Sequence, residues 1–300
     1  MADFWNTDWL NRSEIFAPLR AVGASLPEIG WPNTEILNGL ATSAGRVVNA
    51  QGLRVRFVPP QKANAFDEAF EPRTFLTGEV QVRPLDWHDV FNALVWMTFP
   101  TSKAVINARH YELLSGQLLS GESLSGQSLV NEPSFGTQAG RRPPARDALT
   151  LFDEDGVLVA SSDAGLLQLV REFRWKELFW NRRDAVRSSM RFFVFGHALY
   201  QKSLAPFIGM TGKAVLLHVP ADFYQQSLQR QIDAADRLLA VHIWDRERMC
   251  HGRELWPLPI LGVPGWWAGN EQESFYDNTG YFRSGRNQAA GTVNQTDSST

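Results

Sequence analysis

The sequence has very little cysteine, and it has no long apolar run. Its single cysteine, Cys250, excludes an internal disulfide and any zinc site made of several thiolates, so we expect a partly buried, unreactive thiol. No uninterrupted apolar segment reaches the roughly 20 residues that a membrane-spanning helix needs. The opening residues, MADFWNTDWLNRSE, also lack the basic start and apolar run of a secretory signal. We therefore expect a cytoplasmic protein with no membrane partner.

The chain also lacks a strong excess of charge and several common catalytic motifs. Its formal net charge is −3, which argues against a protein that coats nucleic acid, so no nucleic-acid partner is indicated. It has no G-x-x-x-x-G-K-[ST] loop, no G-x-G-x-x-G after a predicted strand and no G-x-S-x-G elbow. These absences disfavour the common nucleotide-binding enzymes and the serine hydrolases.

What the chain does contain is typical of a folded globular protein. Hydrophobic residues make up 44% and charged residues 20%, and the 11 tryptophans and 19 phenylalanines are enough for a large aromatic core. We expect a single, mainly helical α+β domain over residues 1–283 with a small sheet. A Leu-Ser-Gly motif recurs from Leu114, Leu119 and Leu124, too few units to bury a core by stacking, so residues 115–145 are predicted to form a flexible insertion. The polar tail, residues 284–300, is predicted to be disordered.

Residues 86–110 predict two short helices whose polar side chains are selectively placed. Asp86 can cap the first helix, Pro100 prevents its continuation, and Thr101 can cap the second. His88 and Asn92 share one stripe of the first helix. Lys103, Asn107 and His110 share one face of the second. If the helices pack antiparallel, Asn92 could approach Lys103 or Asn107 and form a polar site.

The periodicity elsewhere predicts further elements. Alternating segments at residues 53–58 and 79–83 and the run at 213–219 indicate strands, and residues 147–161 indicate a β-hairpin that turns at Asp155-Gly156. Helices are expected at residues 33–48, 166–171, 175–180, 186–205 and 222–244. The Trp/Pro-rich segment 256–267 is predicted to be a stiff, extended loop.

His197 is the most informative single residue outside the helical pair. It lies in the apolar stretch FFVFGHALY, where an unpaired imidazole would cost free energy, so it must have a partner. A backbone carbonyl, a carboxylate or a ligand could be that partner. Gly196 beside it indicates close approach of another backbone or of a substrate.

Several motifs that occur in order carry a resemblance to a known family. WHDVFNALVWMTFP, RDALTLFDEDG, FGHALYQK, PLPILGVPGWW and FYDNTGYFR together resemble a proteobacterial family catalogued as domain of unknown function 3025 (DUF3025). The resemblance covers about Phe57 to Arg283. It implies no reaction, fold or cofactor. Gln201 stands where a glutamate is expected in the third motif, and the Leu-Ser-Gly insertion departs from the family pattern.

A divalent metal site is the sharpest chemical hypothesis. Two or three histidines with a carboxylate would suit zinc, manganese or ferrous iron, although no H-E-x-x-H spacing is present. The available ligands are His88, Asp89, His110, Asp147, Asp153, Glu154 and His197. The competing explanations are structural: Asp86 and Asp89 suit a helix N-terminus, Asp-Gly suits a turn, and buried histidines commonly have structural hydrogen bonds.

Two functional hypotheses follow. The first is a hydrolase-like enzyme acting on a small anionic substrate, with acid/base or metal-assisted chemistry. Its catalytic candidates are His88, Asp89, Asn92, His110, Asp153, Glu154 and His197, and its substrate-binding candidates are Lys103, Asn107, Trp266, Tyr276 and Arg283. The second is a non-catalytic module that binds a ligand or a protein through the Trp/Pro-rich segment, with a structural role for the polar helical pair.

Overall fold

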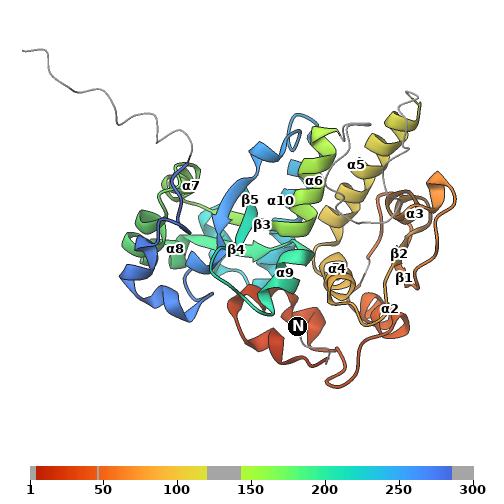
Figure 1. Ribbon diagram of the computed structural model, residues 1–300, viewed down its shortest axis with the longest axis horizontal. Helices are drawn as coiled ribbons and strands as arrows, with labels where there is room; N and C mark the ends of the chain where they lie inside the picture. The colour runs from red at the N-terminus through yellow and green to blue at the C-terminus, as the bar shows by residue number, and fades with distance from the viewer. Residues whose placement is uncertain (1–4, 46, 120–142, 286–300) are drawn as a thin grey trace, which may run out of the picture.

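The computed structural model describes residues 5–45, 47–119 and 143–285, which form a mainly helical α+β fold as predicted (Figure 1). The α-helices are α1 (Arg20–Gly23), α2 (Thr34–Ser43), α3 (Phe70–Thr77), α4 (Trp87–Thr98), α5 (Pro100–Leu119), α6 (Pro144–Asp155), α7 (Ala164–Arg171), α8 (Arg183–Ser189), α9 (His197–Ser203) and α10 (Leu228–Trp244). The strands are β1 (Arg56–Val58), β2 (Glu79–Gln81), β3 (Gly156–Ser161), β4 (Met190–Val194), β5 (Thr211–His218) and β6 (Trp256–Pro259).

The sheet that positions the site has the strand order β4-β3-β5-β6. β3 is antiparallel to β4 and parallel to β5, and every residue of β3 is buried. Helices α6 and α10 pack against β3 and β5, and α10 also packs along α5 (Figure 1). A second, two-stranded sheet pairs β1 with β2 in parallel. One cluster of buried apolar side chains runs from Trp5 to Phe282, so the two sheets share a core.

The predicted hairpin at residues 147–161 is wrong in its first half, which forms α6. In a strand Leu149 and Leu151 would share a face, yet Leu149 is buried and Leu151 is 39% exposed. Phe152 is buried with Leu149, three residues apart, as on a helix. The Asp155-Gly156 pair is therefore the junction between α6 and β3, and only the second half is a strand.

Strand pairing in the main sheet shows that two other predicted elements differ from expectation. The expected helix at residues 186–205 is divided into α8, β4 and α9, because the apolar run Met190–Val194 pairs with β3. In a short apolar run, periodicity alone does not distinguish a strand from a helix. The predicted loop at 256–267 begins with β6, an edge strand that pairs with β5 and tolerates Pro257 and Pro259 because its outer edge needs no N–H.

The insertion predicted at residues 115–145 is only partly described. Residues 115–119 form the last turn of α5, and α6 begins at Pro144. Residues 120–142 lie outside the described residues, as do residues 286–300 of the predicted tail. Among the helices that are described, none is both long enough and apolar enough to cross a bilayer.

The helical pair α4–α5 is confirmed, but its second cap comes from elsewhere. Asp86 caps α4 by accepting the Asp89 N–H at 3.2 Å, as predicted. Thr101 does not cap α5, which begins at Pro100. Instead the buried carboxylate of Asp236 on α10 accepts the N–H groups of Thr101 at 3.0 Å and Ser102 at 2.8 Å.

This cap predicts that Asp236→Ala lowers the free energy of unfolding by about 1–3 kcal/mol, because the buried N–H of Ser102 and the partly buried N–H of Thr101 lose their acceptor. Asp236→Asn retains one acceptor oxygen and should cost less. Urea denaturation of the two variants measures both values. Equal stability of Asp236→Ala and the parent would show that α10 does not contribute this cap.

Candidate functional site

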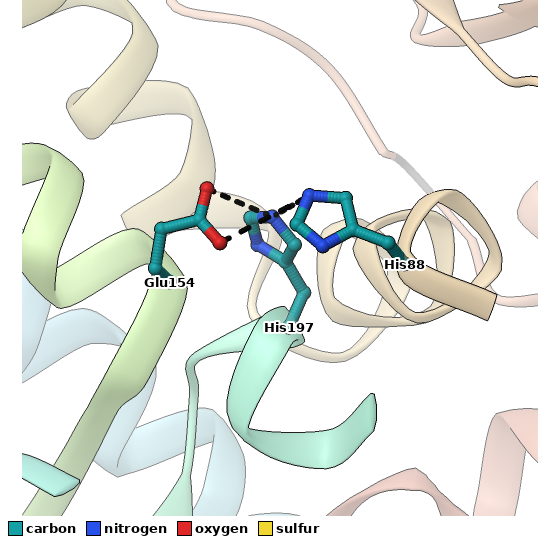
Figure 2. A group of neighbouring side chains, drawn as sticks. All are labelled: His88, Glu154 and His197. Carbon is teal, nitrogen blue, oxygen red and sulfur yellow. Dashed lines mark hydrogen bonds and ion pairs between the residues drawn. The ribbon is translucent and has the colours of Figure 1, made fainter. Parts of the chain in front are cut away.

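Three potential metal ligands from different helices converge between α4, α6 and α9 (Figure 2). Nε2 of His88 lies 3.0 Å from Nε2 of His197. Glu154 reaches both rings, with Oε2 3.9 Å from His88 Nε2 and Oε1 3.6 Å from His197 Nε2. One ligand atom from each residue lies within 4.8 Å of the others. These side chains thus form the compact group that the sequence predicted in part but could not connect.

A backbone contact at Gly196 brings His197 to Glu154. The N–H groups of Phe195 and Gly196 both donate to the carbonyl of Gly156 at 2.9 Å. A Cβ added to Gly196 would clash with the backbone carbonyl oxygen of Glu154, so no side chain fits at this position. Glycine is therefore required because there is no room for a side chain. Its backbone conformation does not require glycine, since a φ of −62° is open to any residue. The expected close approach of another backbone is confirmed.

Burial disfavours the charged forms of all three side chains. Desolvation lowers the pKa of His88 and holds the pKa of His197 well below its usual value, with Lys103 and His88 adding to the effect on His197. Desolvation, assisted by Asp153, raises the pKa of Glu154 to about 7. Both imidazoles are therefore neutral near pH 7, and neutral imidazole is the form that binds a metal ion.

The three side chains line a cavity of about 60 Å³. A single water molecule needs roughly 10–15 Å³, so the cavity admits several waters or a small polar group. Its described lining residues are Phe70, Glu71, Arg83, His88, Asp89, Asn92, His110, Arg146, Thr150, Asp153, Glu154 and His197. The predicted catalytic candidates His88, Asp89, Asn92, His110, Asp153, Glu154 and His197 are all among them.

Glu71 on α3 is a cavity residue that the sequence did not reveal. Asn107 donates from Nδ2 to Oε2 of Glu71 at 2.7 Å and to its backbone carbonyl at 2.9 Å. Desolvation is the main cause that raises the pKa of Glu71 to about 7, against the Asn107 hydrogen bond. No local motif marks Glu71, because its partner lies 36 residues away.

Lys103 and Asp153 form a buried ion pair beside the histidines. Nζ of Lys103 donates to Oδ1 and Oδ2 of Asp153 at 2.7 and 2.9 Å. Oδ2 of Asp153 lies 3.9 Å from Nδ1 of His197, the ring nitrogen turned away from His88. A carboxylate on that side is typical of histidines that ligate metals. Lys103 is therefore occupied by Asp153 and does not point at a substrate.

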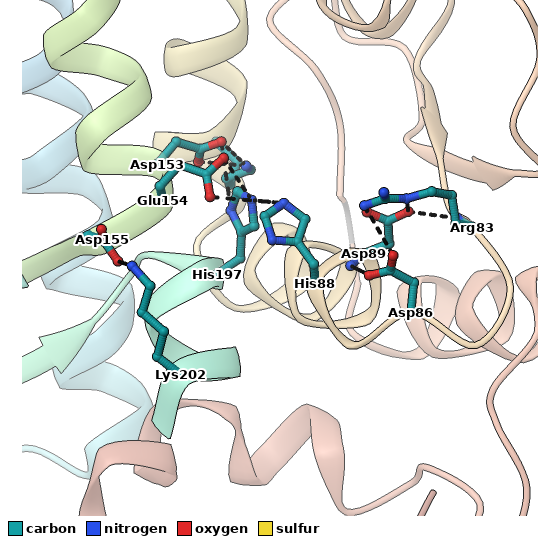
Figure 3. A network of polar contacts seen from close by, with 10 residues as sticks. Arg83, Asp86, His88, Asp89, Asp153, Glu154, Asp155, His197 and Lys202 are labelled. Carbon is teal, nitrogen blue, oxygen red and sulfur yellow. Dashed lines mark hydrogen bonds and ion pairs between the residues drawn. The ribbon is translucent and has the colours of Figure 1, made fainter. Parts of the chain in front are cut away.

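Asp89 is held in a structural contact on the other side of α4, at the right of Figure 3. Its carboxylate accepts the backbone N–H of Arg83 at 2.7 Å and the guanidinium at 2.8 and 2.9 Å. Because both oxygens are engaged, Asp89 orients Arg83 at the cavity wall. This fits the structural explanation of an acid near a helix N-terminus.

The structure does not bring Trp266, Tyr276 or Arg283 to this cavity. Trp266 is 7% exposed. The hydroxyl of Tyr276 donates to the backbone carbonyl of Gly262 at 3.0 Å. Arg283 donates to the carbonyl of Gly280. Asp147 on α6 is likewise absent from the described lining residues.

Comparison with known proteins adds a family and no activity. Residues 55–286 match the family model described as "Protein of unknown function (DUF3025)". The chain belongs to the DUF3025 family. No curated protein and no solved structure matches the chain. His88, Glu154, His197 and Glu71 all lie inside the span matched by the DUF3025 model, so the candidate site is built within the region that defines the family.

The buried carboxyl group of Glu71 predicts a pH-dependent effect of Glu71→Gln. The pKa is raised from 4.5 to about 7 in the folded state, so folding binds a proton between these pH values and the parent loses stability as the pH rises through this range. Glu71→Gln has no carboxyl group to titrate at this position, so it does not lose stability in this way. Relative to Glu71→Gln, the parent should lose about 3 kcal/mol between pH 4.5 and pH 8.

Urea denaturation at both pH values measures this difference. Glu28→Gln, at an exposed loop position, is the matched control and should show no such dependence. A pH-independent effect of Glu71→Gln would mean that Glu71 titrates like an exposed glutamate.

Proposed function

We propose that His88, Glu154 and His197 bind one divalent transition metal ion, and that their cavity is the active site of a hydrolase for a small anionic substrate. The observation that carries this proposal is the convergence of three ligand atoms within 4.8 Å from three separate helices. Ligands about 2.0–2.2 Å from one ion stand roughly 3–4 Å apart. The separations of 3.0, 3.6 and 3.9 Å fall in this range.

The donor set favours a catalytic metal over a structural one. Two imidazoles and one carboxylate suit zinc, manganese or ferrous iron, whereas structural zinc sites use four protein ligands. His88, Glu154 and His197 would hold such an ion, and the ion would supply Lewis-acid activation of water near neutral pH.

We assign the role of general acid/base to Glu71. It lines the same cavity, and its pKa of about 7 lies close to a neutral working pH, where a carboxyl group can both accept and return a proton. Asn107 fixes the orientation of its carboxyl group. Asp153, held by Lys103, faces the second nitrogen of His197 and would keep that ring in the tautomer that presents Nε2.

The substrate class follows from the lining charges and the size of the cavity. Arg83 and Arg146 are the cationic side chains among the described lining residues, and a guanidinium pairs well with carboxylate or phosphate. Arg83 keeps its ion pair with Asp89, which orients its guanidinium at the cavity wall, and it lines the cavity where Lys103 and Arg283 were expected from the sequence. A cavity of about 60 Å³ favours a small group rather than a bulky one at the reacting end of the substrate.

The first test is metal content. Protein purified without chelator or histidine tag should contain about one zinc, manganese or iron ion per chain, and His88→Ala and His197→Ala should each lose it. Elemental analysis by mass spectrometry measures the stoichiometry. His218→Ala, an exposed histidine outside the group, should retain the metal.

The metal proposal fails if the parent stays metal-free after incubation with each of these ions and dialysis. It also fails if His218→Ala loses as much metal as the two ligand variants, since the bound metal would then be unspecific.

The second test is hydrolysis. The metal-loaded parent should cleave members of a panel of small phosphate esters, carboxylate esters and amides. Glu71→Gln should lower kcat by about 10²–10⁴-fold while the metal content stays unchanged, because only the proton transfer is removed. Steady-state kinetics measures kcat, and elemental analysis of the same sample measures the metal. Unaltered kcat in Glu71→Gln would exclude the assigned acid/base role.

A further inference from the structure

A second and much larger cavity lies at the open edge of the main sheet. Its volume is about 1170 Å³, above the 300–1,000 Å³ that is common for small-molecule sites. It is formed by the end of α7, by β5 and β6, and by the C-terminal part of the described chain. The lining residues include Arg171, Phe173, Lys213, Arg253, Trp256 and Arg283. None of the residues that line this cavity lines the histidine cavity.

The cavity concentrates positive charge in a chain of net charge −3. Arg171, Lys213, Arg253 and Arg283 line it, whereas Glu172 is the one acidic residue among its described lining residues. Within the described part of the chain, the structure gives no hydrogen bond or ion pair to the side chains of Arg171, Lys213 or Arg253. Cations gathered around a concave surface raise the local concentration of an anionic ligand.

The strands define the base of the cavity and limit what can enter it. Thr211 and Lys213, two residues apart on β5, point to the same face of the sheet. β6 lies beside them as the edge strand. Pro257 and Pro259 remove two N–H groups from β6, so an added β-strand would find an incomplete ladder. This edge therefore favours a small ligand over an extended peptide.

Aromatic rings complete the cavity. Phe173 and Trp256 are half-buried, with ring centroids 6.1 Å apart, and both line the cavity. Phe173 has a φ of 58°, a left-handed conformation that is costly for a bulky residue and is often retained at ligand sites. Rings beside unpaired cations are the chemistry that binds a flat, charged molecule by stacking and ion pairing.

We propose that this cavity binds a small ring-bearing phosphate ester of the nucleotide class. Lys213 contacts the phosphates from the base of the cavity, Arg171 and Arg253 contact them from the rim, and the ring stacks on Trp256. The site is independent of the metal-binding proposal, because the two cavities share none of the lining residues that the structure describes.

Isothermal titration calorimetry with three probes tests the proposal. ADP carries the ring and the phosphates, adenosine carries only the ring, and inorganic pyrophosphate carries only the phosphates. ADP should bind more tightly than either part, and raising the NaCl concentration from 50 to 500 mM should weaken binding of the two anions. No measurable heat with ADP, or equal affinity for ADP and pyrophosphate, overturns the proposal.

Single substitutions test whether ADP binds in this cavity. Lys213→Ala and Arg253→Ala should each weaken ADP binding about tenfold, as expected for a lost charge-assisted contact. Arg237→Ala, an exposed arginine on α10 outside the cavity, should leave the affinity unchanged. Trp256→Leu should weaken ADP binding but retain pyrophosphate binding, which also shows that the variant is folded.

A last variant separates the two cavities. The same titrations on His197→Ala should give the parent affinity for ADP. If ADP binding disappears in His197→Ala but persists in Lys213→Ala, the nucleotide binds in the histidine cavity and the proposal for the second cavity is wrong.

Discussion

The register between β3 and β4 is the constraint on which the candidate site depends. Val157 pairs with Val194 at one end of this antiparallel ladder, so the residues before Val157 and after Val194 leave the sheet side by side. Glu154 is three residues before that pair and His197 three residues after it. Since α6 leads into β3 without a loop, the site has little freedom to rearrange. A shift of one residue would turn every side chain of the shifted strand to the opposite face and move Glu154 away from His197.

Shifted pKa values and one ion pair explain how so many ionisable groups are tolerated next to the core. An isolated buried charge is expensive, and the site avoids most of that cost by remaining neutral or by pairing. The pKa of each histidine is lowered, the pKa values of Glu71 and Glu154 are raised to about 7, and Lys103 is bound to Asp153. Neutral imidazole is also the form that binds a metal ion, so the neutrality that limits the cost of burial is compatible with the metal proposal.

Much of the fold could be predicted where local chemistry determines it. The α4–α5 pair follows from the Asp86 cap and from Pro100, and the strand at β5 follows from its apolar run. The junction at Asp155-Gly156 was predicted wrongly as a hairpin turn. Asp-Gly is a strong turn signal, and the helical pattern formed by Leu149 and Phe152 is too short to outweigh it.

The candidate site was predictable as a set of residues but not as a geometry. His88 and Asn92 were placed on one stripe by helical spacing, and both line the cavity. The apolar surroundings of His197 required a partner, but the partner is 109 residues away and no local pattern connects the two rings. Glu71 could not be found at all, since its role depends on the way α3 packs against α5. Its environment is a property of the tertiary fold.

Because Asp236 caps α5, the start of this helix depends on a part of the chain that is synthesised later. Ser102 and its neighbour Thr101 obtain their acceptor from a residue synthesised more than a hundred positions later. Until α10 has docked, the first turn of α5 has free N–H groups and frays readily. Lys103 lies in this first turn, so the position from which it binds Asp153 depends on the docking of α10. A partly synthesised chain thus has the side chains of the candidate site without the helix that completes the first turn of α5.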